Sequence, residues 1–360
     1  MSKRPGPSRS AAALASWWSR EGLPEQDRIE ALREIAPELV RVETLATVSC
    51  GERTFPLQAL HVGTDDLDRP VFGLFGGVHG LERIGSHVVL TFLESLLERL
   101  RWDKEARRML RKCRLVAMPV VNPGGMWLRS RANPRGVDLM RNAPVDAEVR
   151  TPFLVGGHRL SRRLPWYRGE PGELEVESRA LVDFVERAIF PARAALTLDV
   201  HSGFGATDRL WFPYAKTTAP FPSMTQVMAL VNLLDRAYPH HVYRIEQQSD
   251  AYTTNGDLWD YLYDRHRAAH PERLFVPWTL EIGSWAWVRK DPRQLFASGG
   301  AGVFNPLRAH RYDRAMRRHL VLLDLFLRSV RNHRRWSGLE PPSPPAGDER
   351  PPGDDTDLER

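Results

Sequence analysis

Apolar and polar positions alternate in two ways along the chain, and the two patterns predict different elements. Short apolar runs that stop at glycine, proline or a polar residue predict buried strands over residues 71–75, 115–121, 195–200 and 274–282. Apolar residues at helical spacing predict helices over residues 12–18, 26–35, 90–100, 173–190, 224–238 and 313–330. Strands that alternate with helices predict an α/β sandwich around a largely parallel sheet.

The same pattern divides the chain of 360 residues into three parts. Residues 1–38 form an N-terminal segment with two short helices, and residues 39–336 form the main domain. Residues 337–360 contain six prolines among acids and almost nothing apolar. Because such a segment cannot bury enough surface to fold, we expect a disordered acidic tail.

Charge is distributed unevenly between these parts. The whole chain has 51 Lys+Arg against 45 Asp+Glu, a formal charge of +6. The tail holds seven acids and two arginines, a net of −5, so residues 1–336 carry +11. Arginines make up 46 of the basic residues, and they are scattered instead of forming blocks. We interpret them first as coding bias and only second as a device for phosphate binding, and we do not expect nucleic acid as a partner.

Two classes of protein are excluded by composition. No apolar run approaches the roughly 18–20 residues that span a membrane, which excludes an integral membrane protein. The basic start of the chain leads into no apolar core or cleavage site of the secretory type. Cys50 and Cys113 cannot staple a chain of this length, so we expect unpaired buried thiols in a reducing cytoplasm.

In open α/β sheets, ligands bind beyond the carboxyl ends of the strands, so the polar residues at those ends are the first candidates. The first predicted strand ends in Gly76-Gly77-Val78-His79-Gly80-Leu81-Glu82. His79 and Glu82 are three residues apart in this strand-to-helix turn and could bind one metal ion from one side. The alternative is a helix-capping histidine and a solvated glutamate.

Two further strand ends carry residues of the same kind. His201 follows the strand at 195–200 and could supply a third ligand, which gives a His₂Glu set with an open position, the arrangement of catalytic zinc. Glu281 interrupts the apolar run at 274–282. Because a carboxylate is costly to desolvate, Glu281 is either a general base beside the metal or the partner of an arginine.

Together these motifs resemble the zinc metallocarboxypeptidase family over roughly residues 40–330. The resemblance rests on His79-x-x-Glu82, Arg131-x-Asn133-x-x-Gly136-Val137-Asp138-x-x-Arg141, Asp199-Val200-His201-Ser202, Tyr252 with Gly256, and Glu281 in Thr-Leu-Glu-Ile-Gly. It implies a three-layer α/β/α sandwich around a mixed, largely parallel sheet, with residues 39–336 as the catalytic domain.

The resemblance also implies a role for each residue of the site. His79, Glu82 and His201 are the ligands of one Zn²⁺ per chain, and Asp138 accepts a hydrogen bond from the free nitrogen of His79. Glu281 takes a proton from the zinc-bound water. Arg131 stabilises the oxyanion of the tetrahedral intermediate.

On the substrate side, the resemblance implies that Arg141 binds a free carboxylate. Tyr252 contacts the substrate from a mobile loop, and Trp259 stands where family members select the terminal side chain. The family has asparagine directly before the arginine, whereas this chain has Met140, so the carboxylate loses a hydrogen bond unless Asn142 supplies it.

Three functions therefore stay open. The first is a zinc-dependent hydrolase of an amide bond, metallocarboxypeptidase-like, acting on a peptide. The second is a deacylase of N-acyl amino acids of the succinylglutamate desuccinylase/aspartoacylase type, with a substrate that also bears a carboxylate. The third is a non-catalytic protein on the same fold that binds an anionic polymer or nucleic acid.

The segment after Gly283, with Trp285 and Trp287, is either a rim of the site or a partner contact, or a set of tryptophans packed under a long loop.

Overall fold

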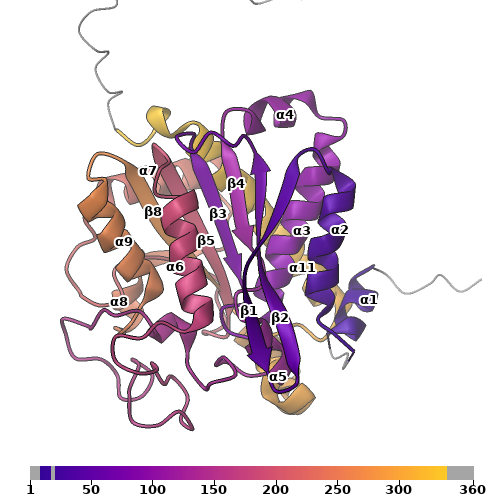
Figure 1. Ribbon diagram of the computed structural model, residues 1–360, viewed down its shortest axis with the longest axis vertical. Coiled ribbons are helices and arrows are strands. Elements are labelled where there is room, and N and C mark those ends of the chain that lie inside the picture. Colours follow the sequence, from indigo (N-terminus) through magenta and orange to yellow (C-terminus); the bar gives the residue numbers. More distant parts are fainter. Residues whose placement is uncertain (1–8, 18–20, 339–360) are drawn as a thin grey trace, which may run out of the picture.

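The computed structural model describes residues 9–17 and 21–338. Its centre is one mixed eight-stranded sheet (Figure 1). The strands are β1 (Val40–Cys50), β2 (Arg53–Gly63), β3 (Val71–Gly76), β4 (Arg114–Met118), β5 (Ala194–Ser202), β6 (Arg209–Phe212), β7 (Arg244–Gln247) and β8 (Leu274–Ile282). The strand order is β1-β2-β4-β3-β5-β8-β6-β7.

The middle of the sheet is parallel and its borders are mixed. β4, β3, β5 and β8 run parallel to one another, whereas β2 is antiparallel to β4 and β6 is antiparallel to β8. Every residue of β3, β4 and β5 is buried, as expected of parallel strands that are covered on both faces. The predicted α/β class and the mixed, largely parallel sheet are confirmed.

Helices cover both faces of this sheet (Figure 1). α3 (Arg83–Leu100) and α11 (Ala309–Arg331) pack on β3 and β5, with α2 (Pro24–Ile35) beside α3. On the other face α6 (Val176–Ala188) contacts β1, and α9 (Leu258–Ala269) contacts β8. The remaining helices are α1 (Arg9–Ser16), α4 (Lys104–Leu110), α5 (Pro123–Leu128), η1 (Leu139–Arg141), α7 (Met224–Ala237), α8 (Gln248–Ala251), α10 (Trp285–Lys290), η2 (Pro292–Val303) and η3 (His333–Arg335).

The structure departs from the predicted elements in places with a local cause. Residues 40–63 form the β1–β2 hairpin, which is not a continuous apolar run because polar residues interrupt the apolar residues of both strands. Gly51, with φ +61°, makes the turn between them. α3 begins at Arg83 and not at residue 90, since its first turn is already buried. Of the predicted tail, residues 339–360 lie outside the described residues.

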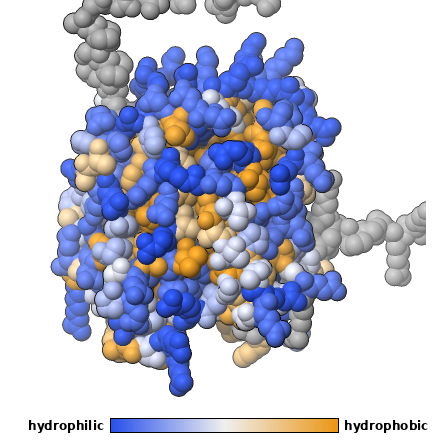
Figure 2. Space-filling model, viewed as in Figure 1, coloured by the Kyte–Doolittle hydropathy of each residue, from blue (hydrophilic) through white to orange (hydrophobic). Residues whose placement is uncertain are grey.

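Two expectations about the class of protein can be compared with the structure. Cys50 and Cys113 are both buried and unpaired. Among the described helices, not one has the length and apolar character needed to cross a membrane. The face seen in Figure 2 is largely hydrophilic, with apolar side chains scattered across it.

Candidate metal centre

Three side chains from the carboxyl ends of neighbouring strands meet within hydrogen-bonding distance. His79 lies in the turn after β3, Glu82 directly precedes α3, and His201 is the eighth residue of β5. Nδ1 of His79 lies 2.8 Å from Oε1 of Glu82 and 3.1 Å from Nδ1 of His201. Nδ1 of His201 lies 3.1 Å from Oε2 of Glu82. All three side chains are buried.

This triangle has the dimensions of one tetrahedral metal site. Ligand atoms about 2.0–2.1 Å from a zinc ion in tetrahedral geometry lie about 3.3 Å from each other. Two imidazole nitrogens and a carboxylate are ligands that zinc accepts, and three protein ligands leave one position open. His79, Glu82 and His201 thus fit a single zinc ion.

The second nitrogen of each histidine faces a buried carboxylate. Nε2 of His79 lies 3.2 Å from Oδ1 of Asp138, and Nε2 of His201 lies 2.8 Å from Oδ2 of Asp199. The hydrogen bond of His79 with Asp138 favours the proton on Nε2, which leaves the Nδ1 lone pair for the metal, and the charge of Asp199 acts in the same direction on His201 although that contact lacks hydrogen-bond geometry. Burial raises the pKa of Asp138, but the charges of Arg131 and His79 outweigh it and hold that pKa well below its ordinary value. The predicted contact between Asp138 and His79 is present.

Glu281 and Arg131 stand beside the three ligands. Glu281 pairs with His201 across β8 and β5, and its Oε2 is shielded from solvent and has no hydrogen-bond partner among the described residues. Burial, and next the negative charge of Glu82, raise the pKa of Glu281 to about 8. Arg131 donates from Nε to Asp138 at 2.8 Å, and its Nη1 lies 3.5 Å from Oε1 of Glu82.

Arg141 is a buried cation that forms no ion pair with any residue that the structure describes. Its guanidinium makes only long contacts, 3.4 Å to the carbonyl oxygens of Val155 and Met140 and 3.5 Å to the hydroxyl of Tyr252. Within the described residues, no carboxylate forms an ion pair with it. Gly256, with φ +71°, lets the loop that carries Tyr252 approach, because a Cβ there would lie 1.9 Å from the carbonyl oxygen of Arg141. The structure thus brings Tyr252 and Arg141 together.

Comparison with known proteins agrees with this geometry. The family model described as zinc carboxypeptidase matches residues 26–283, most of the chain. The chain belongs to the zinc carboxypeptidase family.

This family member has low sequence identity to its curated relatives. It is 25% identical to rat mast cell carboxypeptidase A over 256 residues, 65% of this chain and 58% of the relative. It is 30% identical to carboxypeptidase E of Caenorhabditis elegans over 137 residues, 33% of this chain and 29% of that protein. The chain thus spans less than two thirds of the length of these relatives.

Solved structures show the same fold. Bovine thrombin-activatable fibrinolysis inhibitor, in complex with tick carboxypeptidase inhibitor, matches with a TM-score of 0.62 and 20% identity over 86% of this chain and 96% of that chain. Carboxypeptidase A from Helicoverpa armigera matches with a TM-score of 0.60 and 17% identity over 90% and 79%.

Asn142 and Trp259, the two residues of this family member that were predicted to bind substrate beside Arg141 and Tyr252, form other contacts. The side-chain amide of Asn142 donates to the carbonyl oxygens of Arg168 and Glu173 and accepts from the backbone N–H of Glu175. It therefore braces the main chain and leaves no free group to replace the amide that is missing at Met140. Because the contacts that engage it come from residues 168–175, no local sequence signal could reveal this role.

Trp259 is buried instead of lining an open pocket. Its indole N–H donates to Oδ2 of Asp199 at 3.0 Å, and its ring packs against Phe75 with centroids 4.9 Å apart. The side chain is 3% exposed. Trp259 therefore holds the carboxylate behind His201, which differs from the expected role in selecting a substrate side chain.

One anchor of the site was missed in the sequence. Arg83, the residue after Glu82, is buried and forms a two-point ion pair with Glu25 of α2, at 2.8 Å and 2.5 Å. Burial opposes ionisation of Glu25, but Arg83 and His87 outweigh it and keep its pKa below the ordinary value. The pair fixes the start of α3 and with it Glu82, and its members are too far apart in sequence to be matched by pattern.

Proposed function

We propose that the chain is a zinc-dependent hydrolase that cleaves an amide bond next to a free carboxylate, in the manner of a metallocarboxypeptidase. The observation that carries this proposal is the buried triangle of His79, Glu82 and His201, with the unpartnered carboxylate oxygen of Glu281 beside it. A structural metal site has no need of an unpaired acid at its open side.

The protein side chains divide the work by position. His79, Glu82 and His201 would hold the zinc ion, which would polarise the scissile carbonyl and lower the pKa of a water at the open position. Glu281 accepts the proton of the attacking water and passes it to the leaving nitrogen. Arg131, held in place by Asp138, stabilises the negative charge on the substrate oxygen. Asp138 also keeps His79 in the tautomer that presents Nδ1.

The substrate carboxylate is assigned to Arg141. A buried guanidinium with only long, neutral contacts gains most from a carboxylate, which can accept two parallel hydrogen bonds from it. The Tyr252 hydroxyl lies at the same place and would contact the group next to that carboxylate. An amidated substrate is therefore expected to bind more weakly than the free acid.

The decisive test is Glu281→Gln, assayed with a library of blocked peptides that have a free carboxyl terminus. Loss of the proton acceptor lowers kcat by about 10²–10⁴-fold while one equivalent of zinc stays bound. The matched control is Glu177→Gln, another buried carboxyl whose pKa is raised by burial and which lies outside the site. Wild-type turnover in Glu281→Gln contradicts the proposal.

A second candidate is hydrolysis of N-acyl amino acids. It is favoured by the small number of hydrogen-bond donors around Arg141. Met140 is apolar, and the side-chain amide of Asn142 already donates to the main chain, so a substrate carboxylate at Arg141 has fewer donors than in a peptide site of this family. Parallel rates on acylated amino acids and on peptides decide between the two. Faster turnover of the acylated amino acids assigns the enzyme to the deacylase class.

The non-catalytic alternative has less support, because metal ligands, base and oxyanion arginine lie together. We also propose a cytoplasmic location, supported by two buried thiols that stay unpaired. Fractionation of cells with an antibody against the chain tests this location, and recovery outside the cytoplasm refutes it.

A further inference from the structure

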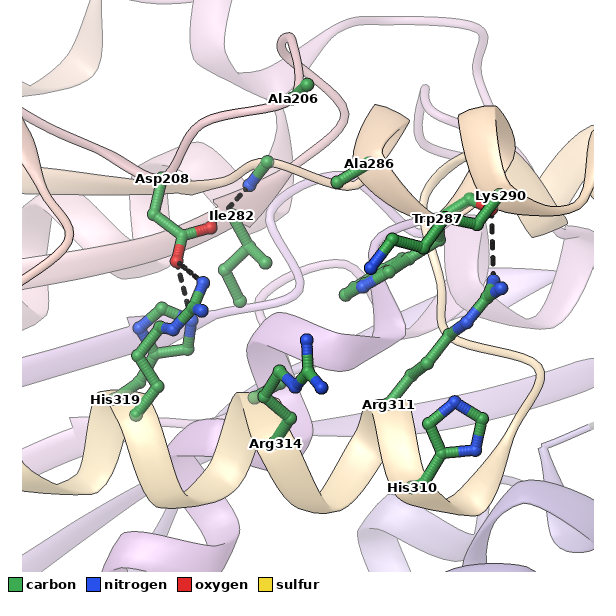
Figure 3. Close-up of a pocket in the computed structure, with 13 residues that line it drawn as sticks. Ala206, Asp208, Ile282, Ala286, Trp287, Lys290, His310, Arg311, Arg314 and His319 are labelled. Carbon is green, nitrogen blue, oxygen red and sulfur yellow. Dashed lines mark hydrogen bonds and ion pairs between the residues drawn. The ribbon is translucent and has the colours of Figure 1, made fainter.

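A pocket outside the metal centre lies between the end of β8, α10 and the first turns of α11 (Figure 3). Its volume is about 240 Å³. Ile282 and Gly283 line it, and since neighbouring strand residues point to opposite faces, Ile282 faces away from the side that Glu281 serves. Trp287 forms part of its wall, so the aromatic segment after Gly283 borders this pocket.

The pocket is lined by basic side chains on one face of α11. His310, Arg311, Arg314 and Arg318 lie there, and the three arginines follow one another at spacings of three and four residues, which bring side chains together on a helix. Lys290, at the end of α10, faces them across the pocket (Figure 3). Like charges at this spacing repel and destabilise a helix. The arrangement therefore gains stability from an anion between them.

The single carboxylate in the lining does not neutralise this charge. Oδ1 of Asp208 accepts the backbone N–H of Gly283 at 2.9 Å, and Oδ2 accepts from Nη1 of Arg318 at 2.6 Å. Asp208 is buried, and both of its oxygens are engaged by these contacts. Asp208 therefore neutralises Arg318 and binds the backbone after β8, and it does not neutralise the other cations.

The other cations of the lining have no acidic partner among the described residues. Arg311 donates to the carbonyl oxygen of Trp287 at 3.0 Å and to the side-chain oxygen of Gln294 at 2.8 Å, which are both neutral. The side chains of Lys290 and Arg314 form no hydrogen bond or ion pair with any residue that the structure describes. Four permanent cations against one carboxylate leave three positive charges around one small pocket.

We infer that this pocket binds a small multivalent anion with a diphosphate or triphosphate group. A single carboxylate would form an ion pair with only one guanidinium group. A phosphate chain carries enough negative charge and enough acceptor oxygens to bind Arg311, Arg314 and Lys290 at once. The inference does not depend on the proposed hydrolase activity, because none of these side chains belongs to the metal centre or to the Arg141 site.

The test is calorimetric titration of the full-length protein with inorganic tripolyphosphate at low salt, in parallel for Arg314→Ala and Arg317→Ala. Arg317 is the matched control, since it is also an exposed arginine of α11 that forms no ion pair with a described residue, but it does not line the pocket. We expect Arg314→Ala to weaken binding at least tenfold and Arg317→Ala to leave it unchanged. Tripolyphosphate can also remove zinc from the protein, but the heat of this reaction is the same for both variants, so it does not affect the difference between them.

Two results overturn the inference. Equal weakening by both substitutions shows attraction to the general basic surface, and loss of binding in Arg141→Ala but not in Arg314→Ala places the anion in the substrate site. ATP titrated without magnesium distinguishes the sources of the phosphate group. Affinity equal to that of tripolyphosphate supports recognition of the phosphate chain alone, and tighter binding supports a nucleotide as the occupant.

Discussion

Gly85→Ala is expected to disable the metal centre without touching a ligand. α3 approaches β5 so closely that a Cβ on Gly85 would lie 2.1 Å from the carbonyl oxygen of Val200. Real Cβ atoms essentially never come within 3.0 Å of a neighbour, so the start of α3 has to move by about 1 Å away from β5. Glu82 precedes this helix and His201 follows Val200, so the two ligands move apart together with the backbone.

The size of the effect follows from two distances. The 3.1 Å between Glu82 and His201 opens to about 4 Å, longer than the edge of about 3.3 Å that one tetrahedral zinc ion requires. The 2.9 Å hydrogen bond from the backbone N–H of Ser202 to Glu82 is stretched as well. We expect zinc affinity to fall by about 100-fold or more, and the overpacked contact itself to cost about 1–3 kcal/mol of the free energy of unfolding.

Competition with a chromophoric chelator measures the zinc affinity, and urea unfolding of the metal-free protein measures the cost of overpacking. Gly22→Ala is the control, because a Cβ there meets nothing within 4 Å. Wild-type zinc affinity in a folded Gly85→Ala protein refutes the argument that the helix–strand contact sets the ligand spacing.

Three further predictions use other contacts of the described chain. Asp138→Asn removes the charge that faces Nε2 of His79 and is expected to weaken zinc binding about 10–100-fold in the chelator assay; an unchanged affinity contradicts that role. Trp259→Phe leaves Asp199 without its indole donor and should cost about 1–3 kcal/mol in urea unfolding, while a changed preference for substrate side chains instead restores the specificity role. Burial lowers the pKa of His87 to about 4 from an ordinary value of 6.5, so the unfolded chain binds this proton first and stability falls as the pH drops from 6.5 toward 4. The free energy of unfolding falls by on the order of 3 kcal/mol over this range. If the free energy of unfolding of a His87→Gln variant depends on pH as steeply as that of the wild type, His87 is not the cause.

The sequence predicted best those features that depend on local pattern. Strands β3, β5 and β8 are mainly apolar and almost entirely buried, and each stops at or next to a glycine or a polar residue, so they are recognisable without knowledge of their neighbours. The β1–β2 hairpin was missed because polar residues interrupt the apolar residues of both strands, which leaves no continuous apolar run. The apolar residues Phe55, Leu57 and Ala59 at every second position, with Gly51 before them, were the signal available.

By itself the sequence determined the chemistry of the metal centre. Residue type and position at a strand end decide whether a side chain can bind zinc, and both are readable along the chain for His79, Glu82 and His201. The tertiary structure alone decided which groups are already engaged and which are free. Asn142 is tied to residues 168–175, whereas Arg141 and Arg314 have no acidic partner among the described residues. The physical reason is that the hydrogen bonds and ion pairs of a buried side chain are made with whatever the packing brings near, and those partners come from distant parts of the sequence.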